Sequence, residues 1–185
     1  MKRCYLLHGI KTVNPWHSSI AFFQHIMPRF QVIVLSYMYI PVVLAVVVPV
    51  INHFVIKRLV KQVHPGHVII GHSNGATIAY RLSKEVYVKG LVLINPALNS
   101  NVEFDKRLGF VHVYWSKKDW VVWVSRLMPF SLWGSMGRTG YTGEDARVRQ
   151  FEMGEKHTSI GDAEVAVRWG PVIVRNIEEA LKTPA

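Results

Sequence analysis

The sequence has a single cysteine, Cys4, so no disulfide can form within the chain. Small disulfide-stapled folds are therefore excluded, and a hydrophobic core must hold the structure together. Half of the 185 residues are hydrophobic and only 18% are charged, which argues against a disordered chain. This length predicts a single domain, residues 1–185, with one core and no second module of comparable size.

Acidic residues are also scarce: 12 Asp and Glu stand against 22 Lys and Arg, a formal net charge of +10. Such a charge raises the question of a nucleic-acid or anionic-membrane partner. The basic residues are scattered, however, with local groups only at Lys57, Arg58 and Lys61 and at Lys117-Lys118, and no RNA- or DNA-binding motif accompanies them. We therefore expect a solvated basic surface and no nucleic-acid partner.

The nine histidines show no paired-ligand spacing of the kind that metal sites use. We expect neither a metal ion nor another cofactor. A secretory signal is missing too, because Met1-Lys2-Arg3 is followed by only a short apolar run. Together with the lone cysteine, this predicts a cytoplasmic protein.

One long stretch, residues 37–56, contains no charged side chain and is about as long as a membrane-spanning helix requires. It also contains Pro41 and Pro49, lies between two expected strands and leads into a basic stretch. We interpret it as an apolar crossover segment. A transmembrane helix and a contact with a membrane surface are the alternatives.

Six short apolar segments alternate with helical patterns along the chain. This alternation predicts βαβ units, a mostly parallel six-stranded sheet, and a three-layer α/β/α sandwich. The expected strands are residues 3–7, 31–35, 67–70, 90–94, 111–115 and 148–153. The expected helices are residues 18–27, a part of 41–63, 74–84, 120–127 and 171–181, the last with Pro171 in its first turn.

The most informative stretch is Gly71-His72-Ser73-Asn74-Gly75, which follows the expected strand 67–70 and precedes a helical pattern. Small residues two positions before and after the serine allow a sharp turn from strand to helix. A nucleophile elbow requires this layout, because the serine hydroxyl must project above the edge of the sheet.

Two further residues follow later strands in the order that a serine nucleophile requires. Asp119 comes just after strand 111–115, and His157 lies in the loop behind strand 148–153. The order serine, acid, histidine is that of an α/β-hydrolase site. The carboxyl ends of parallel strands share one edge of the sheet, so we expect Ser73, Asp119 and His157 to meet there, together with His8 and Asn95.

These residues resemble the α/β-hydrolase superfamily over nearly the whole chain. Leu6-Leu7-His8-Gly9-Ile10 is similar to the family strand that ends in His-Gly. The resemblance implies a strand order of 2-1-3-4-5-6 and an oxyanion hole made by the backbone N–H groups of Ile10 and Asn74. The chain starts at the His-Gly strand, so it lacks the first two strands of the family fold.

The chemistry of such a site explains the residue types. A serine hydroxyl is a weak nucleophile and needs an imidazole, here His157, to accept its proton. Asp119 would orient that imidazole and stabilise its charged form, with Asp105, Asp145 and Asp162 as the alternative acids. We therefore predict a serine hydrolase, carboxylesterase- or lipase-like, that cleaves a small-molecule carboxylic ester or thioester through an acyl-enzyme on Ser73.

Two other functions remain open at this point. One is a non-catalytic binding protein that keeps the fold, and the other is a lipid-acting hydrolase that works at a membrane surface. The oligomeric state is open as well. We expect the substrate pocket to include His8, Trp16, Asn95, Trp120 and Trp133. Residues 129–146 form either a lid or binding loop, or a connector packed by its own aromatic residues.

Overall fold

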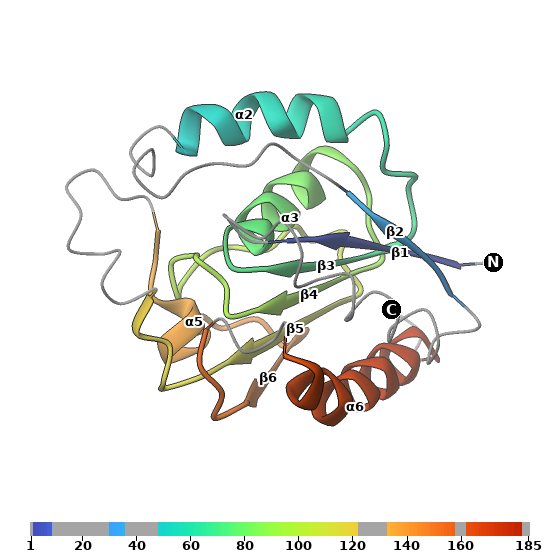
Figure 1. Cartoon of the computed structure of the whole chain (residues 1–185). Helices are drawn as coiled ribbons and strands as arrows, with labels where there is room; N and C mark the ends of the chain where they lie inside the picture. Colours follow the sequence, from blue (N-terminus) through green and yellow to red (C-terminus); the bar gives the residue numbers. More distant parts are fainter. Residues whose placement is uncertain (1, 9–29, 36–47, 122–132, 158–161, 183–185) are drawn as a thin grey trace.

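The computed structural model describes residues 2–8, 30–35, 48–121, 133–157 and 162–182. Their centre is a sheet of six parallel strands in the order β2-β1-β3-β4-β5-β6 (Figure 1). The strands are β1 (Lys2–Leu7), β2 (Phe30–Val34), β3 (Val68–His72), β4 (Gly90–Ile94), β5 (Phe110–Trp115) and β6 (Val148–Glu152). The six expected strands and their expected order are thus confirmed.

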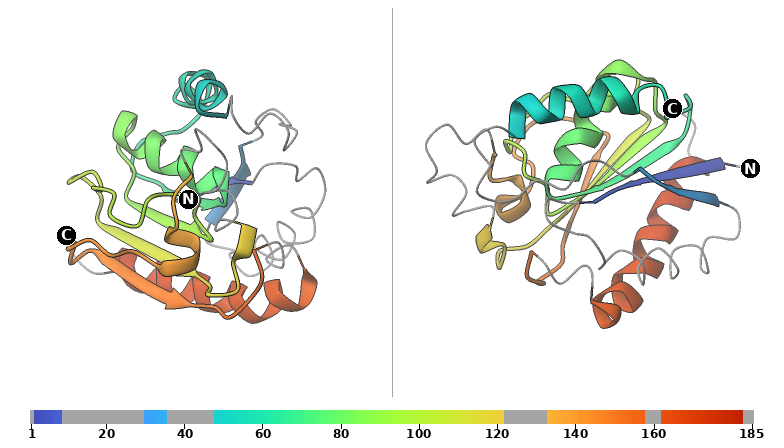
Figure 2. Two further views of the ribbon diagram at one scale, coloured as in Figure 1. Left: turned by 90° about the vertical axis from the view of Figure 1, so that its left-hand side faces the viewer. Right: turned by 45° about the horizontal axis from the view of Figure 1, so that its top comes forward.

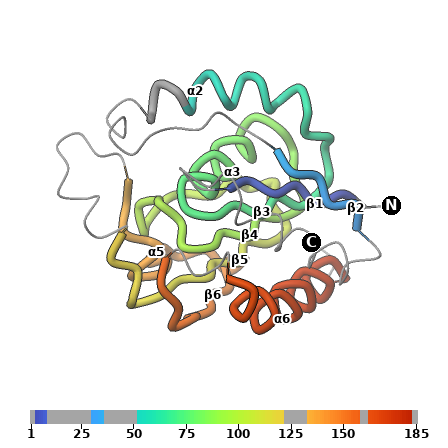
Figure 3. Tube along the Cα trace, in the orientation of Figure 1, coloured from blue at the N-terminus to red at the C-terminus, as the bar shows by residue number. Residues whose placement is uncertain are grey.

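Helices cover both faces of this sheet, which confirms the three-layer architecture (Figures 1 and 2). Helices α2 (Val48–Leu59) and α3 (Asn74–Glu85) lie on one face, and α6 (Ala163–Lys182) lies on the other. The short helix α5 (Met136–Thr139) lies near the carboxyl ends of the last strands. The tube in Figure 3 follows the chain through these strands and helices.

Strand residues alternate between two cores because successive side chains point to opposite faces of a sheet. In β5, Val111 and Val113 pack in the core beneath α2 and α3, whereas Phe110 and Tyr114 pack beneath α6. Every residue of β3 and β4 is buried. This burial explains their continuous apolar sequences, which parallel strands covered on both faces require.

The last helix corrects one expectation. We expected Pro171 in the first turn of a helix, but α6 begins at Ala163 and Pro171 lies inside it. Proline removes the hydrogen bond to the carbonyl four residues earlier, here that of Val167. Both Pro171 and Val167 are exposed, so the missing hydrogen bond lies on the exposed side of α6. The burial of Val165, Ile173 and Ile177 along the opposite side of α6 outweighs this local cost.

Some expected elements lie outside the described residues: the helix at 18–27, most of the helix at 120–127, residues 37–47 of the apolar stretch, and residues 129–132. Trp120 and Val121 are helical, and the rest of the apolar stretch belongs to α2. Among the described helices, none has the length and apolar character needed to cross a membrane.

The described part of the glycine-rich segment, residues 133–146, packs against the end of the sheet. Met136, Gly137 and Tyr141 are buried. The Gln150 side chain accepts a hydrogen bond from the Tyr141 N–H at 2.7 Å and donates one to the Tyr141 carbonyl at 2.8 Å. This reciprocal pair joins the segment to β6.

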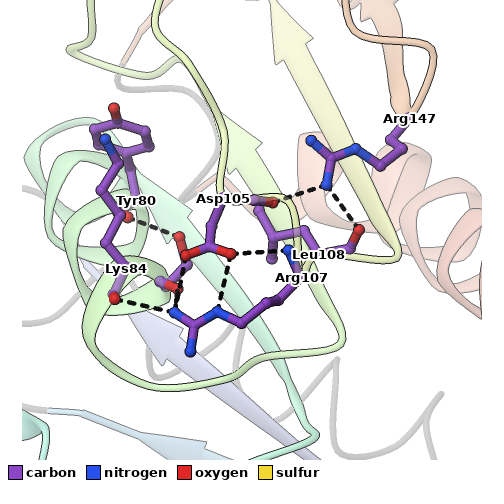
Figure 4. A network of polar contacts seen from close by, with 7 residues as sticks. Tyr80, Lys84, Asp105, Arg107, Leu108 and Arg147 are labelled. Atoms are coloured by element: carbon purple, nitrogen blue, oxygen red, sulfur yellow. Dashed lines mark hydrogen bonds and ion pairs between the residues drawn. The ribbon is translucent and has the colours of Figure 1, made fainter.

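An arginine network holds the connection between β4 and β5 (Figure 4). Arg107 binds the carboxylate of Asp105 through Nε at 2.9 Å and through an Nη atom at 2.8 Å. Arg147 donates to the carbonyls of Asp105 and Leu108 at 2.7 and 3.0 Å. The hydrogen bonds from Arg107 lower the pKa of Asp105 to about 2. The network therefore holds the segment that leads into β5.

Candidate active site

Ser73 stands between β3 and α3 with φ 56° and ψ −123°. Non-glycine residues seldom adopt this conformation, which costs on the order of 1–3 kcal/mol and persists only where the surroundings enforce it. Two backbone hydrogen bonds enforce it here, from Ser73 N–H to the Ile94 carbonyl at 3.0 Å and from Ala76 N–H to the Ser73 carbonyl at 3.0 Å. The turn therefore has the geometry of a nucleophile elbow.

The two glycines of the motif make this turn sterically feasible. A Cβ atom on Gly71 would lie 2.6 Å from the Ala76 Cα and from the Gly75 carbonyl oxygen. A Cβ atom on Gly75 would overlap the backbone carbonyls of Leu7 and His8. Hydrogen in place of a side chain thus lets the start of α3 approach both β3 and the end of β1.

Ser73, His157 and Asp119 form one chain of hydrogen bonds at the carboxyl edge of the sheet. The Ser73 Oγ lies 2.8 Å from His157 Nε2, and His157 Nδ1 lies 2.7 Å from Asp119 Oδ2. A carboxylate only accepts, so Nδ1 carries the proton and Nε2 is left to accept from the serine hydroxyl. Asp119 is fully buried and the His157 side chain is 6% exposed, so water competes little with these bonds.

The carboxylate of Asp119 also accepts a hydrogen bond from Asn95, the residue that directly follows β4. The Asn95 Nδ2 donates to Asp119 Oδ2 at 3.2 Å, the same oxygen that accepts from His157. Asn95 is fully buried and has φ 43°. We expected Asn95 in the wall of the substrate pocket; among the described residues, its side chain contacts the acid. This hydrogen bond helps to orient the Asp119 carboxylate.

His72, the residue before the serine, also belongs to this site, although its motif position carries no signal for such a role. Its Nε2 lies 2.9 Å from the backbone carbonyl oxygen of His157. Carbonyls only accept, so Nε2 is the protonated nitrogen of His72. Burial, and secondarily the neighbouring His157, lower the pKa of His72 to about 3. A neutral His72 therefore holds the backbone of the histidine loop.

A second pair that the sequence does not reveal joins α2 to α3. The side-chain amides of Asn52 and Asn74 exchange two hydrogen bonds, at 3.1 and 3.2 Å. Both residues are almost fully buried. Asn74 directly follows Ser73, so this pair connects α2 to the nucleophile elbow.

The other candidate residues are placed as follows. Ile10 and Trp16 lie outside the described residues. His8 is half-buried at the end of β1, and Trp133 is half-buried before α5. The Trp120 side chain is 59% exposed beside Asp119.

The alternative acids are engaged elsewhere or exposed. Asp105 pairs with Arg107, Asp145 pairs with Arg147, and Asp162 is exposed next to the start of α6. Asp119 is the carboxylate that meets His157. Within the described ranges, no group of three or more His, Cys, Asp or Glu side chains is arranged to hold a metal ion.

Comparison with solved structures identifies the class of fold. A carboxylesterase from the thaumarchaeon Nitrososphaera gargenis superposes with a TM-score of 0.60 and 13% identity, covering 98% of this chain and 91% of that one. An esterase from Exiguobacterium antarcticum superposes with a TM-score of 0.60 and 10% identity, covering 96% of this chain and 92% of the esterase. An extracellular α/β-hydrolase from a Paenibacillus species superposes with a TM-score of 0.52 and 11% identity, covering 90% of this chain and 97% of that hydrolase.

The chain therefore has the α/β-hydrolase fold. At these identities the likeness concerns the fold alone. No protein-family model and no curated protein sequence matches the chain.

Proposed function

We propose that the protein is a serine hydrolase that cleaves a carboxylic ester or thioester through an acyl-enzyme on Ser73. The hydrogen-bonded chain of Ser73, His157 and Asp119 at a strained elbow is the observation that carries this proposal. Strain of this kind is retained where it presents a reactive group. The esterase and carboxylesterase folds that resemble this chain add support for an ester substrate.

In the first half-reaction, Ser73 Oγ attacks the substrate carbonyl carbon while His157 Nε2 takes the hydroxyl proton. The imidazolium that forms is stabilised by Asp119, which stays ionised. Collapse of the tetrahedral intermediate breaks the bond to the alcohol or thiol, and His157 returns the proton to that leaving group. Water then repeats the sequence on the acyl-enzyme, releasing the acid and restoring Ser73.

The negative charge on the carbonyl oxygen needs donors that are in place before the reaction. Asn74 begins α3, and the first N–H groups of a helix have no partner within it. Its backbone N–H is therefore suited to be one donor, with the positive end of the helix dipole behind it. The family resemblance makes Ile10 N–H the other. Each donor contributes roughly 3 kcal/mol to stabilisation of the transition state.

A fluorophosphonate probe tests the proposal directly, because it phosphonylates a serine that a neighbouring base activates. We expect the wild type to be labelled at Ser73, as located by peptide mass. Ser73→Ala and His157→Ala should abolish labelling and lower hydrolysis of short p-nitrophenyl esters about a thousandfold or more.

Ser83→Ala is the matched control. Ser83 is buried on the same helix, and its hydroxyl donates to the neighbouring Tyr80 carbonyl at 2.7 Å. Its replacement should leave labelling unchanged. Folded wild-type protein that neither reacts with the probe nor hydrolyses esters would contradict the proposal and favour a non-catalytic binding protein.

A further inference from the structure

Helix α2 places a polar side chain where an apolar one would be expected. Asn52 is 2% exposed and lies on the same helix as the core residues Val55, Ile56 and Leu59. Figures 1 and 2 show that α2 lies over α3 at this face of the sheet. A buried amide destabilises the fold unless its donor and acceptor are both satisfied. The buried Asn52 amide should therefore have a hydrogen-bond partner.

That partner is Asn74. Asn52 Nδ2 donates to Asn74 Oδ1 at 3.1 Å, and Asn74 Nδ2 donates back to Asn52 Oδ1 at 3.2 Å. Rotating either amide by half a turn would set donor against donor and acceptor against acceptor. The pair is therefore directional and holds the Asn74 side chain in one orientation, which a contact between two apolar side chains would not do.

The backbone that Asn74 shares with Ser73 is the strained part of the elbow. The Ser73 N–H and carbonyl are held from the side of β4, by the Ile94 carbonyl at 3.0 Å and by the Ala97 N–H at 3.3 Å. In the described part of the chain, no backbone hydrogen bond uses the Asn74 N–H. The amide pair holds Asn74 from the opposite side, that of α2.

We propose that Asn52 is a positioning residue that keeps the backbone N–H of Asn74 aimed at the substrate oxyanion; this inference rests on the proposed function. A donor stabilises an oxyanion only within a narrow range of distance and direction. Loss of the pair lets the strained peptide between Ser73 and Asn74 relax, and the donor moves with it. Ser73, His157 and Asp119 keep their own contacts.

If the Asn52–Asn74 pair had only a structural role, its loss would lower stability without a specific effect on catalysis. A variant of Asn176 serves as the control that distinguishes this role from a positioning role. Asn176 is also a buried asparagine on a helix, and its side chain donates to the Tyr114 hydroxyl at 2.8 Å. It lies on α6, across the sheet from the elbow. Asn52→Leu and Asn176→Leu should both lower the melting temperature, because each leaves a buried polar group without its partner.

The decisive measurement compares kcat and KM for a p-nitrophenyl ester, together with the rate of fluorophosphonate labelling, in these variants. Asn52→Leu should lower kcat and the labelling rate about 10- to 100-fold, with KM changed less than about threefold, as expected for a contact used in the transition state. Asn176→Leu should keep kcat within about twofold of the wild type. Equal kcat in Asn52→Leu and the wild type would overturn the proposal.

Two safeguards keep the test decisive. If Asn52→Leu does not fold, the double variant Asn52→Leu/Asn74→Leu removes both amides and restores an apolar contact. It should fold and still react slowly, whereas a wild-type labelling rate would overturn the positioning role. If the wild type itself is inert toward probe and ester, the proposed function fails and this inference fails with it. A reactive wild type with an equally reactive Asn52→Leu refutes the positioning role alone.

Discussion

His72 Nε2 lies 2.9 Å from the backbone carbonyl oxygen of His157, and the two imidazole centroids are 5.1 Å apart. The residue before the candidate nucleophile thus holds the loop that carries the candidate base. A second contact supports the same loop, an ion pair between Glu155 and Arg168 of α6 at 2.5 Å. The His72 contact is buried and the Glu155 contact is at the surface, so the His72 contact should matter more.

Replacing His72 with leucine should therefore displace the histidine loop. We expect kcat for a p-nitrophenyl ester to fall about tenfold or more, because a small misplacement of the base weakens proton transfer. His72→Gln should recover part of this loss, since its amide N–H can donate to the same carbonyl. Steady-state kinetics of both variants provide the measurement, and equal activity of the two would argue against the hydrogen bond.

A substitution at Gly137 tests whether the activity depends on the position of the Asp119 carboxylate. Glycine to alanine inside a helix usually stabilises by about 0.5–1 kcal/mol. A Cβ atom on Gly137 would lie 2.8 Å from Asp119 Oδ2 and 2.9 Å from the Asn95 carbonyl carbon. We expect the opposite sign here: Gly137→Ala should lower the melting temperature and reduce kcat about tenfold or more, by moving the carboxylate away from His157.

Thr139→Ala provides the control on the same short helix. Thr139 is exposed and its hydroxyl bonds only nearby groups, such as the Ser135 carbonyl at 3.1 Å. Its replacement should leave kcat unchanged. Wild-type kcat in Gly137→Ala would mean that the acid tolerates displacement.

The stability of the protein should fall between pH 7 and pH 5 because two buried histidines resist protonation. Burial is the main cause that lowers the pKa of His112 to about 4 and that of His72 to about 3. Below about pH 6.5 the unfolded chain takes up protons that the folded chain does not. Each histidine should then cost about 2 kcal/mol of unfolding free energy by pH 5.

His112→Leu isolates one of these contributions. His112 lies between the rings of Phe110 and Phe151, and neither of its ring nitrogens has a hydrogen-bond partner among the described residues. Urea titrations at several pH values should show about half the wild-type loss in this variant. Asp105 does not interfere, because its lowered pKa affects stability only below about pH 4. An unchanged pH slope would contradict the assignment.

Arg147 should matter for stability and not for catalysis. It forms an ion pair with Asp145 at 2.7 Å and also donates to two backbone carbonyls (Figure 4). Its side chain is 27% exposed, so we expect Arg147→Met to cost about 1–2 kcal/mol, with solvent screening included. Labelling of Ser73 should proceed at the wild-type rate.

Arg175→Met is the matched control for this network. Arg175 is 68% exposed and lies 3.9 Å from Glu179, so its replacement should change stability by less than about 0.5 kcal/mol. Chemical denaturation measures both variants. Equal stability of the two would show that the carbonyl contacts of Arg147 contribute nothing measurable.

The sequence predicted the strands well because each is a short apolar run buried on one or both faces. Its errors lie at the ends. The strand expected to end at Ile70 continues to His72, because Gly71 and His72 pair with Leu93 and Ile94 of β4. Where a strand ends thus depends on its neighbour, which sequence pattern does not show. Pro171 was misplaced for a related reason, since the packing of α6 overrides local propensity.

By itself the sequence determined the alternation of strands and helices, the glycines around Ser73, and the residues that follow the strand ends. These features are local, because backbone sterics and side-chain periodicity act over a few neighbouring residues. Tertiary structure alone decided the contacts of His72 with His157, Asn95 with Asp119 and Asn52 with Asn74. Each contact joins residues from separate parts of the chain. A hydrogen bond forms only when donor and acceptor lie within a narrow range of distance and angle, and the tertiary structure decides which atoms come that close.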